Sequence, residues 1–254
     1  MYLRAKFKRI LKKIASGLLY DTLQFYYWKL NIKSGKLSEK EIYALPMIIK
    51  PKDYAIDIGA HYGRFTYPLS QIVGQDGHVF SVEPVYHCFS MLNRIVDALK
   101  LTNVSIYNIA LSNQNGEIEM VIPTDQSGLH VYSCSHIVNE YSADNEALIS
   151  TQKIQCQTLD QFVTSNEISK IDLIKCDVEG AELLILQGSE NVIKKYHPVL
   201  ILEIESRHTQ QYNYEPEDLL TLLCQYGYKA HIFIGAEIIP TQSIIPDQNN
   251  YIFF

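Results

Sequence analysis

Short apolar runs and helical repeats alternate along most of this chain. Residues 54–58 combine aromatic, apolar and β-branched side chains, which predicts a buried strand. A turn bracketed by Gly59 and Gly63 follows it. Apolar residues then recur at helical spacing, at Phe65, Leu69, Ile72 and Val73. The pattern predicts a unit of strand, glycine loop and helix, which is typical of a cofactor-binding corner.

The same alternation continues to the end of the chain. Further strands are predicted at residues 78–82, 103–108, 117–122, 153–157, 171–176, 199–204, 228–234 and 250–254. Helices are predicted at 85–99, after 158–160, from the 177–182 block to 195, and at 216–226. Residues 123–150 lack periodicity, so we expect a mobile loop over the site. Strands alternating with helices predict a doubly wound α/β sheet, with its ligand crevice at the carboxyl ends of the strands.

The glycine loop has the spacing Asp57-x-Gly59-x-x-x-Gly63. A dinucleotide oxidoreductase would be expected to have G-x-G-x-x-G, which is absent. The carboxylate of Asp57 would repel a phosphate but could hold an ammonium, such as the amino acid end of S-adenosylmethionine. Taken alone, the loop is equally compatible with an ordinary glycine turn in an α/β protein.

An acid at the end of the second predicted strand strengthens this interpretation. Glu83 lies 20 residues beyond Gly63, where a nucleotide-binding fold places the carboxylate that accepts hydrogen bonds from the ribose hydroxyls. The alternative is a surface acid that interacts with the N-terminus of the next helix. The spacing favours ribose binding.

Charge and composition narrow the class of protein. The 254 residues carry a formal charge of -6, and six basic residues with no acid fall within residues 1–13. The acidic remainder argues against a nucleic-acid substrate. Five scattered cysteines without C-x-x-C spacing suit reduced thiols in a cytoplasmic protein. His130 and His136 lack a third ligand at matching spacing, so no metal is expected. We also expect neither a signal peptide nor a membrane span.

Residues 1–35 form a separate basic segment. Apolar residues at helical spacing predict an amphipathic helix, with an aromatic cluster after it. The helix either caps the following domain, which the pattern favours, or rests peripherally on an anionic membrane at the inner face. The apolar residues are Phe7, Ile10, Leu11, Ile14 and Leu18, and the cluster is Phe25, Tyr26, Tyr27 and Trp28.

Six short motifs together resemble the FkbM family of S-adenosylmethionine-dependent methyltransferases. They are residues 57–63, 82–84, 110–112, 158–160, 174–182 and 198–203, and the Asp-Val-Glu-Gly block at 177–180 is the most specific. The resemblance implies a methyltransferase domain over residues 36–254. It also implies a mostly parallel seven-stranded Rossmann-like sheet with helices on both faces. Family members are known or presumed O-methyltransferases of sugars, polyketides, glycolipids and polysaccharides.

The resemblance also implies cofactor contacts. The methionine end of S-adenosylmethionine would lie against the glycine loop and the start of the next helix, the ribose against the second strand end, and the adenine edge after the third strand. The residues are Asp57, Gly59, Ala60, His61, Gly63 and Thr66 for the first, Glu83 and Pro84 for the second, and Asn108 to Ala110 for the third. The family usually has Asn where this chain has His61, and imidazole titrates near neutrality, so the pH behaviour of that contact can differ.

Methyl transfer to an alcohol requires alignment and a base that removes the hydroxyl proton. Asp177 and Glu179 follow a predicted strand, so we expect one to contact the acceptor or the cofactor amine and the other to take the proton. His208 is the alternative base. Both acids could instead cap the next helix. A non-catalytic glycan-binding or complex-forming protein on the same fold stays open, as do the acceptor and the oligomeric state.

Overall fold

The computed structural model describes residues 17–36, 39–124, 130–137, 149–245 and 248–254. Most of the amphipathic repeat predicted from Phe7 to Leu18 therefore lies outside the described residues, as do 125–129 and 138–148 of the predicted mobile loop. No described helix is both long and apolar enough to cross a bilayer.

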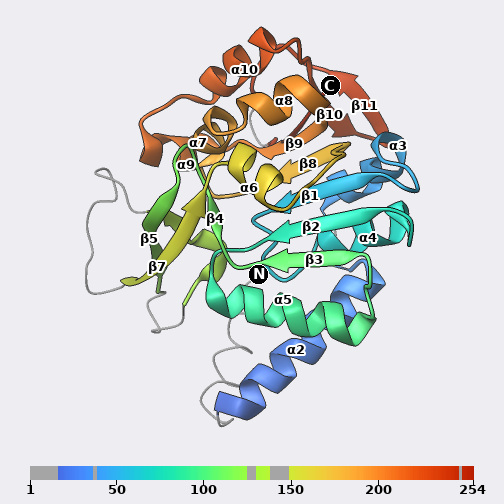
Figure 1. The fold of residues 1–254 in the computed structure, drawn as a ribbon, viewed down its shortest axis with the longest axis vertical. Coiled ribbons are helices and arrows are strands. Elements are labelled where there is room, and N and C mark those ends of the chain that lie inside the picture. The colour runs from blue at the N-terminus through green and yellow to red at the C-terminus, as the bar shows by residue number, and fades with distance from the viewer. Residues whose placement is uncertain (1–16, 37–38, 125–129, 138–148, 246–247) are drawn as a thin grey trace.

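The fold is built on a mixed sheet, and Figure 1 shows it from one edge strand to the other. Among the described residues it has eight strands in the order β11-β10-β12-β9-β8-β1-β2-β3. The five strands from β9 to β3 pair in parallel, whereas β12, β10 and β11 add antiparallel pairings. The strands are β1 (Tyr54–Ile58), β2 (His78–Val82), β3 (Val104–Tyr107), β8 (Leu173–Cys176), β9 (Val199–Glu203), β10 (Ala230–Ile234), β11 (Glu237–Pro240) and β12 (Asn250–Phe253). The doubly wound α/β prediction is confirmed, but the count of seven strands is not, because β11 extends the edge.

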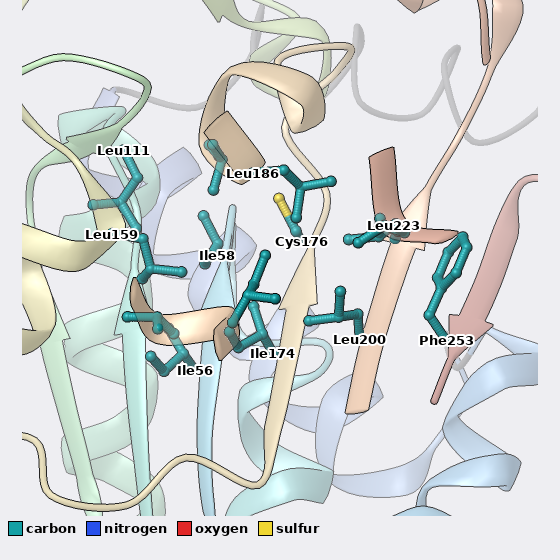
Figure 2. Close-up of a cluster of buried hydrophobic side chains, with 14 of the residues drawn as sticks. Ile56, Ile58, Leu111, Leu159, Ile174, Cys176, Leu186, Leu200, Leu223 and Phe253 are labelled. Carbon is teal, nitrogen blue, oxygen red and sulfur yellow. The ribbon is translucent and has the colours of Figure 1, made fainter. Parts of the chain in front are cut away.

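Helices cover both faces of this sheet. Alternate residues of β1 point to opposite sides, so Ile56 and Ile58 belong to one core cluster and Ala55 to another. The first cluster, part of which Figure 2 shows, is closed by α6 (Leu159–Ser165), α7 (Glu182–Gln187), α8 (Glu190–Tyr196) and α10 (Pro216–Gln225). The second is closed by α3 (Leu45–Ile48) and α4 (Thr66–Val73). The predicted helix through residue 195 is wrong in one respect, because it is split into α7 and α8.

A second sheet lies at the end of the first toward which the arrowheads of β1, β2 and β3 point in Figure 1. Its order is β4-β7-β5-β6, and β5 pairs with β7 along its whole length. Its strands are β4 (Ala110–Leu111), β5 (Gly116–Pro123), β6 (His136–Ile137) and β7 (Ile149–Gln157), with the 3₁₀ turn η2 (Tyr132–Cys134) before β6. Part of the region predicted to be irregular is therefore regular.

The first described helix, α2 (Gly17–Ser34), packs beside α5 (Tyr86–Leu99) (Figure 1). Ile32, Phe25 and Trp28 of α2 join a core cluster with Met91 and Ile95 of α5. The part of the N-terminal segment that the structure describes thus contacts the main domain. This contact is what a capping helix requires.

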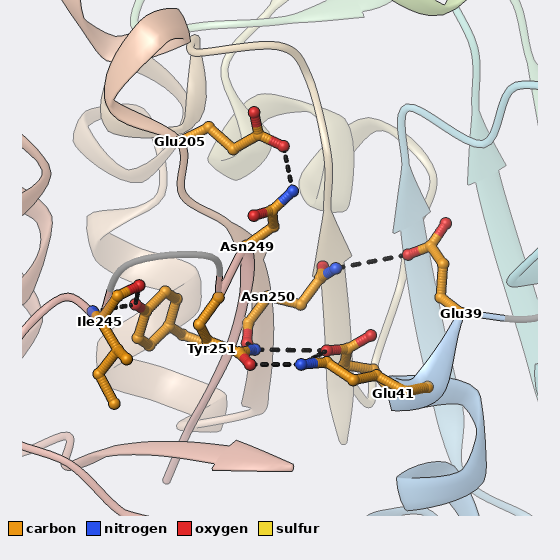
Figure 3. A network of polar contacts seen from close by, with 9 residues as sticks. Glu39, Glu41, Glu205, Ile245, Asn249, Asn250 and Tyr251 are labelled. Carbon is orange, nitrogen blue, oxygen red and sulfur yellow. Dashed lines mark hydrogen bonds and ion pairs between the residues drawn. The ribbon is translucent and has the colours of Figure 1, made fainter. Parts of the chain in front are cut away.

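A polar network ties the residues before β1 to the last strand (Figure 3). Asn250 donates to Glu39 over 3.4 Å, and Gln248 donates to buried Glu41 over 3.4 Å. Glu41 and Lys40 lie in η1 (Lys40–Ala44), and Lys40 donates to Gln248. The network holds the amino end of β12 against the segment that precedes β1 and the glycine loop.

Candidate active site

The glycine loop turns sharply at the end of β1. Gly59 has φ +76°, and the N–H groups of Gly59 and Ala60 both donate to Val82 O, over 3.0 and 3.1 Å. A Cβ on Gly59 would lie 1.8 Å from the carbonyl oxygen of Asp177. Only glycine therefore permits both the positive φ and the close approach to the end of β8. The loop brings the ends of β1, β2 and β8 together.

Asp57 lies beneath this loop and is only 2 % exposed. Its Oδ2 accepts a 2.6 Å hydrogen bond from Thr66 Oγ1, which is also 3.0 Å from Ser81 Oγ. Burial raises the pKa of Asp57 to about 6, although the Thr66 hydrogen bond opposes the rise. The side chain ties the end of β1 to the start of α4. Its predicted contact with the methionine end of a cofactor stays a prediction.

Glu83 connects the end of β2 to the glycine loop. Its Oε2 accepts from His61 N over 2.7 Å and its Oε1 from Val85 N over 2.8 Å. Burial raises the pKa of Glu83 to about 7, and these two hydrogen bonds oppose the rise. A carboxylate has about four lone-pair sites, so each oxygen retains capacity for a further donor such as a ribose hydroxyl.

Asn108 and Ala110 shape the same region from the end of β3. Asn108 Nδ2 donates to the carbonyl oxygens of Glu83 and Pro84, over 2.9 and 2.8 Å. Ala110 is 3 % exposed and packs in the cluster that contains Met91. Asn108 thus fixes the backbone around Glu83 and Pro84, and the predicted contact of residues 108–110 with adenine stays a prediction.

The end of β8 carries a buried charge pair. Lys175 is 1 % exposed, and its Nζ lies 3.1 Å from Asp177 Oδ2 and 4.9 Å from the centre of the Phe65 ring. Burial raises the pKa of Asp177, but Lys175 and a hydrogen bond from Glu203 outweigh it, so the net shift is downward. Burial and the charge of Asp177 raise the pKa of Glu203. We infer that Asp177 is ionised and that neutral Glu203 donates to it.

Glu179 and His208 form a second pair. Glu179 Oε2 lies 3.0 Å from His208 Nε2, and the two side chains are 21 % and 11 % exposed. His208 follows β9 in α9 (Ser206–Thr209). Burial lowers the pKa of His208, but the hydrogen bond and charge of Glu179 outweigh it and raise the pKa overall. The sequence predicted each residue as a candidate but did not predict their contact.

Gly180 allows the loop after β8 to approach α9 closely. It has φ +104°, and a Cβ there would lie 2.5 Å from the carbonyl oxygen of His208. The Asp-Val-Glu-Gly block therefore lets the loop after β8 pack directly on α9. Within this loop, the carboxylate of Glu182 accepts hydrogen bonds from Val178 N over 3.0 Å and from Gly180 N over 3.4 Å. The alternative in which Asp177 and Glu179 serve as helix caps is not supported, because the N-cap of α7 is Ala181.

The site also contains one group with metal-ligand geometry. Glu179, Glu203 and His208 each offer a ligand atom, and these atoms lie within 4.8 Å of one another. Such a set could hold a divalent cation. The sequence analysis considered His130 and His136 instead, and among the described residues neither belongs to this group.

Comparison with known proteins identifies the domain. Residues 57–230 match the Methyltransferase FkbM domain family, which is more than half of the chain. The chain belongs to this family.

Two known methyltransferases are similar to this FkbM protein. Over 174 residues, it is 25 % identical to hexuronic acid methyltransferase AglP of Haloferax volcanii, covering 68 % of this chain and 62 % of AglP. The crystal structure of methyltransferase FkbM from Methylobacillus flagellatus KT superposes with a TM-score of 0.50 at 14 % identity, covering 98 % of this chain and 58 % of that chain. The chain thus spans about three fifths of the length of each relative.

The cofactor of this FkbM domain is S-adenosylmethionine. The carboxylate acceptors described above fit that molecule, because Glu83 retains lone pairs for ribose hydroxyls and Asp177 is an ionised carboxylate that suits an ammonium. Sequence analysis left Lys175 unassigned, because a lysine within an apolar strand carries no local signal of its partner. It also missed the contact of the Trp28 ring with the loop, which is edge-on to His61 with ring centroids 5.8 Å apart and tilted against Tyr62 with centroids 4.8 Å apart.

Proposed function

We propose that this FkbM protein transfers a methyl group from S-adenosylmethionine to a hydroxyl group of a sugar or glycan. The observation that carries the proposal is the contact between Glu179 and His208. Glu179 lies in the same loop as the ionised Asp177, at the carboxyl edge of the sheet. The sugar class is supported by the similarity to a hexuronic acid methyltransferase. Uronic acids are therefore the first acceptors to try.

The two pairs suggest a division of labour. Asp177 has a lowered pKa, which makes it a weak proton acceptor and a good partner for an ammonium or a hydroxyl donor. His208 has a raised pKa, which brings it closer to working pH, where a general base is most efficient. Asp177 is thus assigned to binding and the Glu179–His208 pair to proton removal.

The contact between Glu179 and His208 also suggests which nitrogen is basic. If Nε2–H donates to Glu179, the lone pair of the neutral imidazole is on Nδ1. Nδ1 takes the hydroxyl proton, and the carboxylate of Glu179 stabilises the imidazolium that results. When bound, S-adenosylmethionine supplies an electrophilic methyl group that needs little further activation.

A single series of variants tests this division. Wild type, Asp177→Asn, Glu179→Gln and His208→Gln are incubated with S-adenosylmethionine and a panel of uronic acid and hexose glycosides, and S-adenosylhomocysteine is quantified. Cofactor affinity is measured by calorimetry, with NAD as a negative control. Glu190→Gln is the matched control, because Glu190 is 57 % exposed and pairs with Lys194 on the surface of α8.

Glu179→Gln and His208→Gln should bind cofactor normally and lose on the order of a hundredfold in turnover, because a positioned base typically contributes ~10²–10⁴-fold. Asp177→Asn should instead weaken the binding of cofactor or acceptor. Full activity in the Glu179 and His208 variants would refute the assignment of the base. Binding of glycans without turnover in the wild type would favour the non-catalytic alternative.

A further inference from the structure

Helix α2 is apolar on two opposite sides. One side carries Phe25, Trp28 and Ile32, which pack toward α5 and the glycine loop. The other side carries a stripe of exposed residues, which we call the outer stripe. It consists of Leu19, Leu23, Tyr26 and Leu30, which are 51, 40, 52 and 61 % exposed. Their spacing of four, three and four residues places them along one face of the helix.

An uncovered stripe of this kind on a peripheral helix requires an explanation. Single exposed apolar residues are normal on a protein surface, but a row of four large ones over three turns marks an interaction site. Figure 1 shows that α2 lies at the outside of the molecule, with α5 between it and the sheet. The outer stripe is therefore available to a partner that approaches from solvent.

The charges around the outer stripe indicate the chemistry of that partner. Lys29 Nζ lies 5.3 Å from the centre of the exposed Tyr26 ring, and Lys33 is exposed one turn after Leu30. Residues 1–13 add six basic residues and no acid. The rest of the chain has 16 basic and 28 acidic residues, which follows from totals of 22 and 28. In the sequence, the excess positive charge thus lies in the segment that precedes the stripe.

We propose that the outer stripe of α2 docks on an anionic lipid surface. Leucine and tyrosine enter the boundary between headgroups and acyl chains, and adjacent Lys and Arg side chains pair with the headgroups. A second copy of the chain that paired stripe to stripe would bring its own Lys29 and Lys33 against those of the first copy, whereas an anionic lipid surface brings only opposite charge. Charge complementarity therefore favours lipid.

Docking would bring the membrane close to the glycine loop. The inner side of the same helix contacts His61 and Tyr62, through Trp28. An enzyme held in this way would sample acceptors that are attached to lipid at a high local concentration. The lipid surface is a separate inference from the transfer chemistry, and it can fail while the methyltransferase activity stands.

The test is sedimentation of the full chain with phosphatidylcholine vesicles, with and without phosphatidylglycerol, at low and high salt. Wild type should bind only the anionic vesicles, and binding should fall as salt rises. Leu23→Glu with Leu30→Glu should reduce binding by roughly tenfold or more, because two apolar contacts become charged and repelled. The matched control is Met47→Glu, since Met47 is 54 % exposed but lies on α3. It should bind as wild type does.

Melting temperature and S-adenosylmethionine affinity are measured on the same preparations. Both should be unchanged in the double variant, because the two leucines are exposed. Equal vesicle binding by the double variant and the wild type would overturn the proposal. Failure of the wild type to bind anionic vesicles would also overturn it. A wild-type dimer in light scattering that the double variant abolishes, without vesicle binding, would assign the stripe to a second copy instead.

Discussion

Substituting Gly59 with alanine tests whether the glycine loop and the end of β8 form one unit. The added Cβ would lie 1.8 Å from the carbonyl oxygen of Asp177, whereas real Cβ contacts essentially never fall under 3.0 Å. Either the loop or the carbonyl must therefore move by more than 1 Å. That movement would displace Asp177, which lies at the proposed binding edge.

Two terms contribute to the expected loss of stability. The left-handed backbone conformation at φ +76° destabilises a residue that has a Cβ by roughly 1–2 kcal/mol. Forcing a methyl group against backbone in a packed region costs about 1–3 kcal/mol more. Gly59→Ala should thus lower the free energy of unfolding by ~2–5 kcal/mol.

Gly235→Ala provides the matched control. Gly235 has φ +59°, and nothing lies within 4 Å of the position of its Cβ. It should pay only the backbone cost of about 1–2 kcal/mol. Urea unfolding followed by circular dichroism gives both values, and calorimetry with S-adenosylmethionine should show weaker binding for Gly59→Ala alone. Equal losses of stability and normal cofactor affinity in both variants would refute the steric argument.

Three further predictions concern the site. Glu83→Ala should weaken S-adenosylmethionine binding roughly tenfold or more in calorimetry, since a charge-assisted hydrogen bond contributes ~1.5–3 kcal/mol; an unchanged isotherm would remove Glu83 from the ribose contact. Turnover should rise with pH through an inflection above 6.5, because the pKa of His208 is raised and only neutral imidazole accepts a proton. Glu179→Gln should move that inflection to lower pH in a rate profile. Incubation with a chelator should leave turnover unchanged, because Glu179 already holds His208 at 3.0 Å; loss that Mg²⁺ or Mn²⁺ restores would make this group a metal site.

The core elements could be predicted from the sequence because their signals are local. The strand at 78–82 matches β2, and the helix at 85–99 matches α5 within one residue, since each carries its own periodicity. The edge strand β11 was missed because three of its four residues are exposed, its two isoleucines are adjacent rather than alternating, and it ends in Pro240. The two-residue strands β4 and β6 exist only through their pairing with β7 and β5.

Tertiary contacts also account for the split between α7 and α8. The carboxylate of Asp160 accepts from Asn191 N over 3.1 Å and from Val192 N over 2.8 Å, and Asp160 N donates to Gly188 O. An acid about 30 residues earlier thus caps the start of α8, which no local pattern reveals. The arrangement of the candidate site likewise depends on tertiary contacts. Acids at strand ends could be predicted from topology, but the contact of Glu179 with His208 depends on how two loops pack.

That packing determines how freely the proposed catalytic pair can move. Tyr214 OH donates to Gly180 O over 2.7 Å, and the backbone of Gly180 lies against that of His208 with no room for a methyl group between them. The loop after β8 and helix α9 therefore move together or not at all. Glu179 and His208 are held 3.0 Å apart before any acceptor binds, so the proposed base would need little reorganisation energy for alignment at the moment of transfer.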